Sequence, residues 1–331
     1  MISATPVEIS VIIVNYGTPE LAINAVESVL SRHHGGRIVD VHLVDNNSPG
    51  NDADHFRQAH KTRNWEDRVT LYLEDTNHGF GRGNNVVLNA LAARPAPPAT
   101  VMLLNPDAEL ENEAISLQAD FLDTHSDHAV VGPAITKPDG TKVTSAFRFP
   151  NAAAEFARAV NFGPISRLFR NRTVALSPEY ASSEVDWVAG AAPLIRFKAL
   201  QKAGFFDPAY FLYFEEVDLM RQITNQGGKI GYLPEARVVH VEGAATNVRS
   251  NSQTPKRTPA FWYHSWAHYY LKNHGRGGAM LAAVAWCSGA AMNCIIAPLR
   301  RQQPSTPQRF FRDFWAVAGR EILGLKAKDY A

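Results

Sequence analysis

The feature that most constrains the fold is the apolar run Ile9–Val14, which is rich in β-branched residues and shows no alternation with polar ones. A strand with one wet face alternates apolar and polar residues, so this run predicts a strand buried on both faces, as in a parallel sheet. Further strands are predicted at Val39–Val44, Val69–Leu73 and Val101–Leu104. Together they predict a mainly parallel sheet.

Helical signals stand among these strands. Thr18-Pro19-Glu20 is typical of a helix start, with Thr18 as the N-cap and Pro19 at the first position. Residues Gly79–Leu91 begin with glycines and continue as a helix, whereas residues 45–50 are predicted as a loop. This order predicts a doubly wound α/β unit, and 331 residues suffice for one large domain or two ordinary ones.

The middle of the chain is less regular. A helix is predicted at Ala114–Leu122 and a short strand at Ala129–Val131. Residues 151–183 are weakly patterned, so we expect an irregular binding loop or lid there. Strands at Val185–Phe197 and Gly231–Val241 are expected around a helix near Glu216–Gln226.

Charge and cysteine content exclude several classes of function. The formal net charge is +1, so no overall field favours nucleic acid as a partner. The two cysteines, Cys287 and Cys294, fit neither a zinc site nor a disulfide framework. Met1–Pro6 has no signal-peptide pattern, so we expect the chain on the cytoplasmic side.

The C-terminal part differs in kind from the rest. Residues 279–299 contain no charged side chain, and the length of this segment suits a membrane span. Arg300 and Arg301 follow it directly. Arg309–Leu325 mixes aromatic residues with arginines, as does a helix in a membrane interface. The alternative is two helices that pack on the catalytic domain or on a second subunit, which would make a homodimer.

Polar residues follow four of the predicted strands. They are Asn15-Tyr16-Gly17, Asp45-Asn46-Asn47, Asn77-His78-Gly79 and Asn105-Pro106-Asp107. Each group alone is explained by turn formation. In an open α/β sheet, however, ligands bind beyond the carboxyl ends of the strands, so four groups on one rim predict a binding site.

Three places carry candidate catalytic chemistry. Asp107 suits Mg²⁺ or Mn²⁺, although a helix-capping acid explains it equally well. Glu215, Glu216 and Asp218 lie beside aromatic residues, which favours a general base, and a solvated helix start is the alternative. His240 is either a metal ligand or a structural histidine.

Seven ordered motifs resemble the family two glycosyltransferases with a GT-A fold, and more narrowly their bacterial rhamnosyltransferase-like branch. The resemblance covers about residues 8–247, followed by a helical region at 255–331. The motifs are VIIVNYGTPE, VHLVDNNSPG, NHGFGRGNN, VMLLNPDAEL, VDWVAGAAPLIR, FFDPAYFLYFEEVDLMRQ and LPEARVVH. The resemblance implies a Rossmann-like mixed sheet that is mainly parallel and flanked by helices. It also implies a nucleotide-sugar half at 8–113 and an acceptor half at 114–247.

The resemblance also implies roles for single residues. The nucleotide-sugar pocket would include Asn15, Tyr16, Asp45, Asn77, Gly79, Asn84, Asn105, Asp107 and Gly190, and the acceptor would meet Trp187 and Glu215. Glu216 matches the general base, with Asp218 as the second candidate. Asp107 and His240 match metal ligands. Asn105 stands where the family usually has Asp, so dependence on the metal is expected to be less strict.

The implied function is inverting sugar transfer, with L-rhamnose from dTDP-rhamnose as the favoured donor and a lipid-linked or polysaccharide acceptor at the cytoplasmic face of the membrane. A nucleotidyltransferase on the same fold would usually carry a basic glycine-rich loop after the first strand, and residues 15–19 contain no Lys or Arg. A non-catalytic sugar-binding relative is the third possibility.

Overall fold

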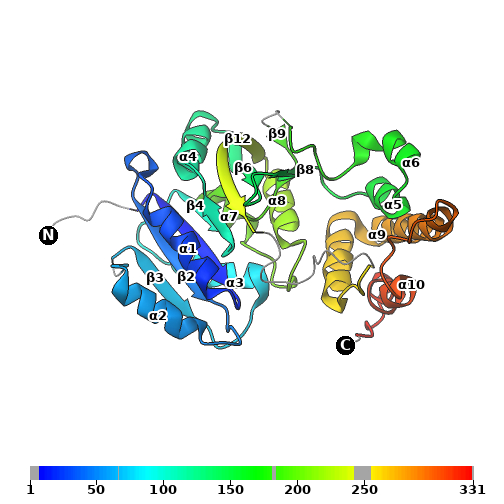
Figure 1. Cartoon of the computed structure of the whole chain (residues 1–331), viewed down its shortest axis with the longest axis horizontal. Helices are drawn as coiled ribbons and strands as arrows, with labels where there is room; N and C mark the ends of the chain where they lie inside the picture. Colours follow the sequence, from blue (N-terminus) through cyan, green and yellow to red (C-terminus); the bar gives the residue numbers. More distant parts are fainter. Residues whose placement is uncertain (1–6, 66, 181–183, 242–254, 330–331) are drawn as a thin grey trace. The chain divides into compact units, whose positions relative to one another are not determined.

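The computed structural model describes residues 7–65, 67–180, 184–241 and 255–329, and the predicted absence of a signal peptide concerns residues outside these ranges. The chain divides into two compact units (Figure 1). Unit 1 contains Met1–Phe147, Leu176–Pro208 and Glu216–Arg249. Unit 2 contains Arg148–Ala175, Ala209–Glu215 and Ser250–Ala331. Residues 148–175 and 209–215 therefore pack with the C-terminal residues rather than with their neighbours in the chain.

The first half of the sheet is parallel, as predicted. Strand β1 (Ile9–Asn15) lies between β2 (Val39–Asp45) and β4 (Thr100–Leu104) and is parallel to both. Strand β3 (Val69–Leu73) extends the sheet beside β2. All seven residues of β1 are buried, which explains the absence of apolar–polar alternation in Val11–Val14. The carboxyl ends of these four strands lie at one edge of the sheet.

The second half makes the sheet mixed. Strand β11 (Leu194–Arg196) is antiparallel to both β4 and β6 (His128–Thr136), and β12 (Lys229–His240) is parallel to β6. The short β5 (Ala108–Leu110) closes the order β3-β2-β1-β4-β11-β6-β12-β5. This topology brings the carboxyl end of β12 to the same edge as that of β4.

Helices cover both faces of the sheet, each over its own apolar core. One core includes residues of α1 (Pro19–Leu30), α2 (Asp52–Thr62) and α4 (Ala114–Thr124). The other includes residues of α3 (Gly79–Ala92), α7 (Phe197–Ala203) and α8 (Glu215–Asn225). The predicted doubly wound arrangement is thus confirmed.

Some local predictions were wrong. A helix, α2, follows the turn at residues 45–50, where only a loop was expected. The single strand predicted at Val185–Phe197 is three short ones: β9 (Glu184–Val185), β10 (Trp187–Val188) and β11. The reason is that β10 leaves the main sheet to pair with β8 (Ala146–Phe147), and a turn precedes β11. Strand β7 (Lys142–Val143) pairs with β6.

Unit 2 is helical, and the described part of the segment at 151–183 is more regular than expected. It contains α5 (Ala152–Val160) and α6 (Gly163–Leu168). The side chain of Asn151 caps α5 by accepting a hydrogen bond from the Ala154 N–H at 3.0 Å. The C-terminal helices are α9 (Ala260–Leu299), α10 (Phe310–Phe314), a π-helical turn at Trp315–Gly319 and α11 (Arg320–Ile322).

Helix α9 is the centre of unit 2. It is interrupted at Gly275, whose φ of 65° and ψ of 179° are not helical. Beyond this break, Gly289 lies against α5, where a Cβ would stand 2.6 Å from the Phe156 carbonyl oxygen. The buried carboxylate of Glu155 on α5 accepts hydrogen bonds from Trp266 and Tyr270 of α9. Of the described helices, α9 alone is long and apolar enough to cross a membrane, by length and composition only.

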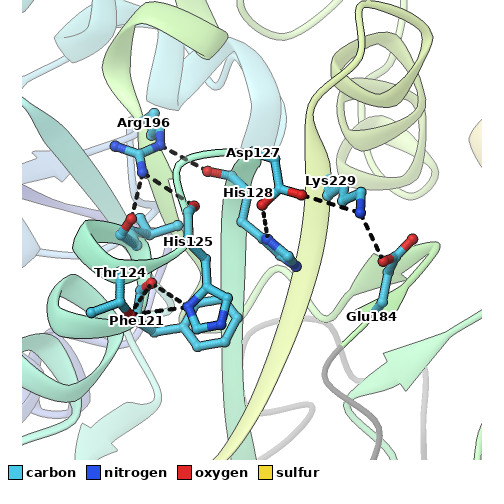
Figure 2. A network of polar contacts seen from close by, with 9 residues as sticks. Phe121, Thr124, His125, Asp127, His128, Glu184, Arg196 and Lys229 are labelled. Carbon is cyan, nitrogen blue, oxygen red and sulfur yellow. Dashed lines mark hydrogen bonds and ion pairs between the residues drawn. The ribbon is translucent and has the colours of Figure 1, made fainter.

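A polar network fixes the opposite edge of the sheet (Figure 2). Arg196, at the end of β11, donates to the carbonyl oxygens of His128 and Leu122 at 2.8 and 2.5 Å. Asp127 contacts His128 at 2.8 Å and Lys229 at 3.1 Å, and these contacts lower the pKa of Asp127 to about 2. The network joins β6, β11 and β12 at the edge away from the polar strand ends described next.

Candidate active site

The carboxyl ends of β1 and β2 carry one connected group of polar side chains. Asn15 is fully buried, and its Nδ2 donates to Asp52 Oδ2 at 2.8 Å and to Ser48 Oγ at 3.1 Å. The Ser48 hydroxyl donates to Asp45 Oδ1 at 2.6 Å. The predicted residues Asn15 and Asp45 are therefore brought together. Ser48 and Asp52 were missed as site residues, although they stand in and just after the turn that follows β2.

A second amide cluster joins β2 to the start of α3. Asn46 is buried, and its Nδ2 donates to Asn77 Oδ1 at 3.1 Å and to the Gly79 carbonyl at 3.2 Å. Its Oδ1 accepts a hydrogen bond from the His78 N–H at 3.1 Å. Gly79 has a φ of 74°, which only glycine adopts without strain. The predicted Asn77 and Gly79 thus depend on Asn46, whose own role the sequence did not reveal.

Other residues of the glycine-rich segment have a packing role. A Cβ on Gly83 would stand 2.9 Å from Val14 Cγ1, so this glycine lets α3 approach β1 closely. Asn84 is buried, and its Nδ2 donates to the Phe80 carbonyl within the helix at 3.0 Å. Tyr16, in contrast, is 39% exposed directly after β1. Of these three, Tyr16 is the one free to meet a ligand from solvent.

Asp107 and His240 meet at the end of β12. In the antiparallel pair of β5 and β12, His240 lies opposite Ala108, which brings residues 133 positions apart into contact. His240 Nε2 lies 2.9 Å from Asp107 Oδ1 and 3.3 Å from Asn105 Nδ2. Both Asp107 and His240 are largely shielded from solvent, with side chains 6% and 13% exposed. The two predicted metal ligands are therefore adjacent, and the atypical Asn105 is their neighbour.

Asp107 and His240 are suited to bind a divalent cation whose remaining ligands do not come from the protein. Two ligands at right angles on an ion with bonds of about 2.1 Å are about 3.0 Å apart, close to the Asp107–His240 distance. Within the ranges that the structure describes, no cluster of three or more His, Cys, Asp or Glu side chains could hold a metal. A cation here would complete its shell with water and phosphate oxygens, as Mg²⁺ and Mn²⁺ commonly do.

Glu216 lies in the first turn of α8. Its Oε2 is shielded from solvent and accepts no hydrogen bond from any residue that the structure describes. Burial raises the pKa of the Glu216 carboxyl above its ordinary value of 4.5. Directly before this helix, Tyr213 and Phe214 both have positive φ, 70° and 69°. Bulky residues rarely adopt such angles, and strain of this kind concentrates at functional sites.

The turn before β11 connects Glu216 to the Asp107 region. A Cβ on Gly190 would stand 3.5 Å from the Cβ and Cγ of Glu216, so the turn lies against this carboxylate side chain. The next residue, Ala191, accepts a hydrogen bond from the Asn105 N–H at 2.8 Å. The predicted Gly190 and Glu216 are therefore neighbours, and the turn that holds them is bonded to the loop that carries Asp107.

The remaining acceptor-side candidates differ in accessibility. Asp218 is 1% exposed, and its Oδ1 accepts a hydrogen bond from Gln222 at 3.3 Å. Glu215 is also buried and belongs to unit 2. The indole of Trp187 stacks on Phe147 with ring centroids 4.0 Å apart. Asp218 is thus already engaged within its helix, whereas Trp187 offers a fixed aromatic surface in unit 1.

Comparison with known proteins identifies the family of the chain. The glycosyltransferase-like family 2 matches residues 6–258. The N-acetylglucosaminyl-diphospho-decaprenol L-rhamnosyltransferase of Mycobacterium tuberculosis is 30% identical over 218 residues, covering 63% of this chain and 69% of that protein. The rhamnosyltransferase WbbL of Escherichia coli is 23% identical over 173 residues, or 51% of this chain and 63% of that one.

Solved structures show the same fold. A mannosyltransferase from Pyrobaculum calidifontis, in complex with GDP-Man and Mn²⁺, matches 96% of this chain and 88% of its own with a TM-score of 0.56 at 14% identity. GalNAc-T7 with UDP, GalNAc and Mn²⁺ matches 97% of this chain and 55% of its own, with a TM-score of 0.55 at 15% identity. The chain therefore belongs to the family two glycosyltransferases and has their GT-A fold.

Proposed function

We propose that this glycosyltransferase moves L-rhamnose from dTDP-rhamnose to a hydroxyl of a lipid-linked saccharide, with inversion at the anomeric carbon. The sugar and the acceptor class are suggested by the names of the two relatives. The proposed reaction rests on the position of Glu216, whose side chain lies beside Gly190. The turn that contains Gly190 is hydrogen-bonded to the loop that carries Asp107. One base and a diphosphate site are the minimum that a single displacement requires.

The donor would bind along the edge formed by β1, β2 and β3. Asp45 and Asp52 offer carboxylates there, which only accept hydrogen bonds and so suit the hydroxyl and N–H groups of a nucleoside. The buried amides of Asn15 and Asn46 hold these loops in place. The exposed ring of Tyr16 is available to stack on a base.

Transfer would proceed in one step. Glu216 accepts the proton of the acceptor hydroxyl as its oxygen bonds to the anomeric carbon of the sugar. At the same time the bond between that carbon and the diphosphate oxygen breaks, and the nucleoside diphosphate leaves with the bonding electron pair. A carboxylate whose pKa is raised by burial is a stronger base than one in water, which suits this proton transfer. Trp187 would support the acceptor from its position on Phe147.

Asp107 and His240 would hold a divalent cation, with Asn105 beside them. Such a cation offsets negative charge on the leaving diphosphate. Because Asn105 contributes no charge, we propose that the metal is bound less tightly than by two acids. The similar structures of the mannosyltransferase and of GalNAc-T7 both contain Mn²⁺, which supports a cation in this fold.

The place of action would be the cytoplasmic face of the membrane. A lipid-linked acceptor keeps its lipid in the bilayer, so the enzyme must work close to that surface. The apolar helix α9 supports this placement. A homodimer stays a prediction that neither the fold nor the relatives address.

The test is a product assay with defined substrates. Purified protein is incubated with dTDP-rhamnose, UDP-glucose, UDP-galactose, UDP-galactofuranose or UDP-N-acetylglucosamine and with an N-acetylglucosaminyl-diphospho-lipid acceptor, with Mg²⁺, Mn²⁺ or EDTA. We expect release of dTDP from dTDP-rhamnose alone, a rhamnosylated lipid by mass spectrometry, and an inverted anomeric configuration by NMR.

Other outcomes would contradict specific parts of the proposal. Transfer from a different donor would replace rhamnose while leaving sugar transfer intact. Retention of configuration would exclude Glu216 as the base of a single displacement. Release of pyrophosphate in place of a nucleoside diphosphate would identify nucleotidyl transfer, and donor binding without turnover would identify a non-catalytic relative.

A further inference from the structure

The near-neutral chain consists of two oppositely charged units. The ranges of unit 1 contain 17 Lys and Arg against 27 Asp and Glu, whereas those of unit 2 contain 16 against 5. The formal charges are therefore −10 and +11, although the whole chain carries only +1. A charge of this size concentrated in one helical unit attracts anionic partners.

Most acidic side chains of unit 2 already contact a basic side chain of the same unit. Glu155 pairs with Arg158, and Asp313 pairs with Arg257. Glu321 and Asp329 both contact His264. The arginines at the end of α9 and the start of α10 have no ion pair within the described part of the chain, and all four are exposed: Arg300, Arg301, Arg309 and Arg312. These exposed guanidinium groups are therefore accessible to an anionic partner.

The same end of unit 2 contains a cavity. Its volume is about 360 Å³, and it is lined by Pro304, Pro307 and Phe311 together with Arg309 and Arg312. Cys294 contributes from α9. A lining that combines arginines with apolar residues suits a phosphate that carries a hydrocarbon chain, because arginine binds phosphate through paired N–H donors.

An exposed apolar stripe on α9 leads toward this cavity. Leu281, Val284 and Ile295 are 63%, 50% and 65% exposed, and Leu299 is 81% exposed. Their spacing places them on one side of the helix, with Ser288 and Ala291 between them. The helix of a soluble protein usually presents polar residues to water, so an apolar stripe of this length indicates a contact surface.

The opposite side of α9 is covered by other parts of unit 2, and this limits how the helix can contact a membrane. Trp286, Gly289 and Asn293 are buried, and Asn293 Nδ2 donates to the Val160 carbonyl of α5 at 3.0 Å. A helix that spans a bilayer would have to leave these contacts or take α5 with it. A helix lying in the interface keeps them and buries only its exposed stripe.

We propose that unit 2 binds an anionic bilayer surface, with a lipid phosphate in the cavity at Arg309 and Arg312 and the stripe of α9 in the interface. Phe311 and Trp315, 40% and 37% exposed on the adjacent turns, add aromatic anchors of the kind found at membrane interfaces. This proposal rests on the proposed function in one respect only: the lipid-linked acceptor explains why the enzyme works at a membrane.

The experiment measures binding of the full chain to vesicles without donor or acceptor. Sedimentation with phosphatidylcholine vesicles is compared with sedimentation with vesicles containing 30 mole per cent phosphatidylglycerol, at about 0.1 and 0.5 M salt. We expect binding to the anionic vesicles only, weakened by salt. The double variant Arg309→Gln/Arg312→Gln should bind about 30-fold more weakly.

Two further variants separate the components. Lys137→Gln/Lys198→Gln removes the same charge from exposed positions of unit 1 and should bind like the unchanged protein. Leu281→Ser/Ile295→Ser should lower binding and should leave the circular dichroism spectrum unchanged, because both side chains are exposed. The transferase assay with a short water-soluble acceptor should be unaffected by all of these variants.

Several results would overturn the proposal. Equal binding to neutral and anionic vesicles would exclude recognition of lipid phosphate. An equal loss of vesicle binding in Lys137→Gln/Lys198→Gln would show that binding depends on net charge alone and not on Arg309 and Arg312. A stable dimer that ignores vesicles and dissociates in Leu281→Ser/Ile295→Ser would assign the stripe to a second copy of the chain. Each result can occur with the transferase intact, so failure here is distinct from failure of the proposed reaction.

Discussion

Replacement of Glu216 by glutamine tests the centre of the proposed mechanism. Glutamine keeps the shape of the side chain against Gly190 but cannot accept the acceptor proton. General bases contribute 10²–10⁴-fold to enzymatic rates, so we expect turnover to fall about 10³-fold, which corresponds to about 4 kcal/mol of transition-state stabilisation. Donor binding should be nearly unchanged, because Glu216 acts on the acceptor.

The same variant should be more stable than the unchanged protein at neutral pH. Burial raises the pKa of Glu216 in the folded state, so folding favours the protonated carboxyl. Its contribution to the free energy of unfolding is therefore full below pH 4.5, the ordinary value, and is lost as the pH rises through the raised pKa. Glutamine is neutral at every pH and shows no such loss. A loss of activity with a gain in stability is typical of a catalytic position.

The assay combines turnover, pH dependence and unfolding. In the unchanged protein, kcat/KM should rise with pH through the raised pKa of Glu216 and then level, and this rise should vanish in Glu216→Gln. Urea unfolding at pH 5 and pH 8 should show the larger stability gain at pH 8. Asp218→Asn is the matched control, and because Asp218 is engaged with Gln222 we expect its turnover to fall less than tenfold.

Near-normal turnover of purified Glu216→Gln would refute this assignment. If Asp218→Asn then lost most activity, Asp218 would be the base. Lower stability of Glu216→Gln at pH 8 would contradict the burial argument independently, since it would mean that the ionised carboxylate is stabilised in the folded protein.

Three further predictions concern other parts of the molecule. Asp107→Ala should lower activity at least 100-fold and abolish stimulation by Mn²⁺, measured by metal titration of the transferase assay, and undiminished stimulation would place the metal elsewhere. Gly83→Ala should destabilise the fold by about 1–3 kcal/mol in urea unfolding, because its Cβ would stand 2.9 Å from Val14 Cγ1. His264 contacts Glu321 and Asp329, which raise its pKa to about 9, so its stabilising effect should be full below pH 6.5 and lost as the pH rises through 9. The melting temperature of the unchanged protein should fall more steeply over that range than that of His264→Gln, and parallel curves would contradict the ion pairs.

Much of the fold followed from local patterns. The buried run at Ile9–Val14 was predictable because a β-branched run without alternation is typical of a strand covered on both faces. Its three parallel neighbours were predictable as short segments rich in Val and Leu. The helices at residues 151–168 were missed because they are short, and short helices are stabilised mainly by tertiary packing. The strand predicted at residues 185–197 was wrong because β10 pairs outside the main sheet.

The candidate site was predictable only in part for the same reason. That Asn15, Asp45, Asn77 and Asp107 share one edge follows from parallel strands, whose carboxyl ends coincide. The hydrogen bonds of Asn46, Ser48 and Asp52 did not follow, because turn-forming residues look alike in sequence whether or not they bind a ligand.

By itself, the sequence determined a parallel α/β sheet with polar strand ends and, through the order of its motifs, the glycosyltransferase family. Only the tertiary structure decided which residues meet. The antiparallel pairing of β5 with β12 places His240 beside Asp107, and the turn before β11 places Gly190 against Glu216. The physical reason is that the first contact is set by strand register between residues 133 positions apart and the second by the packing of a turn against a helix, whereas sequence patterns report only a residue's immediate surroundings.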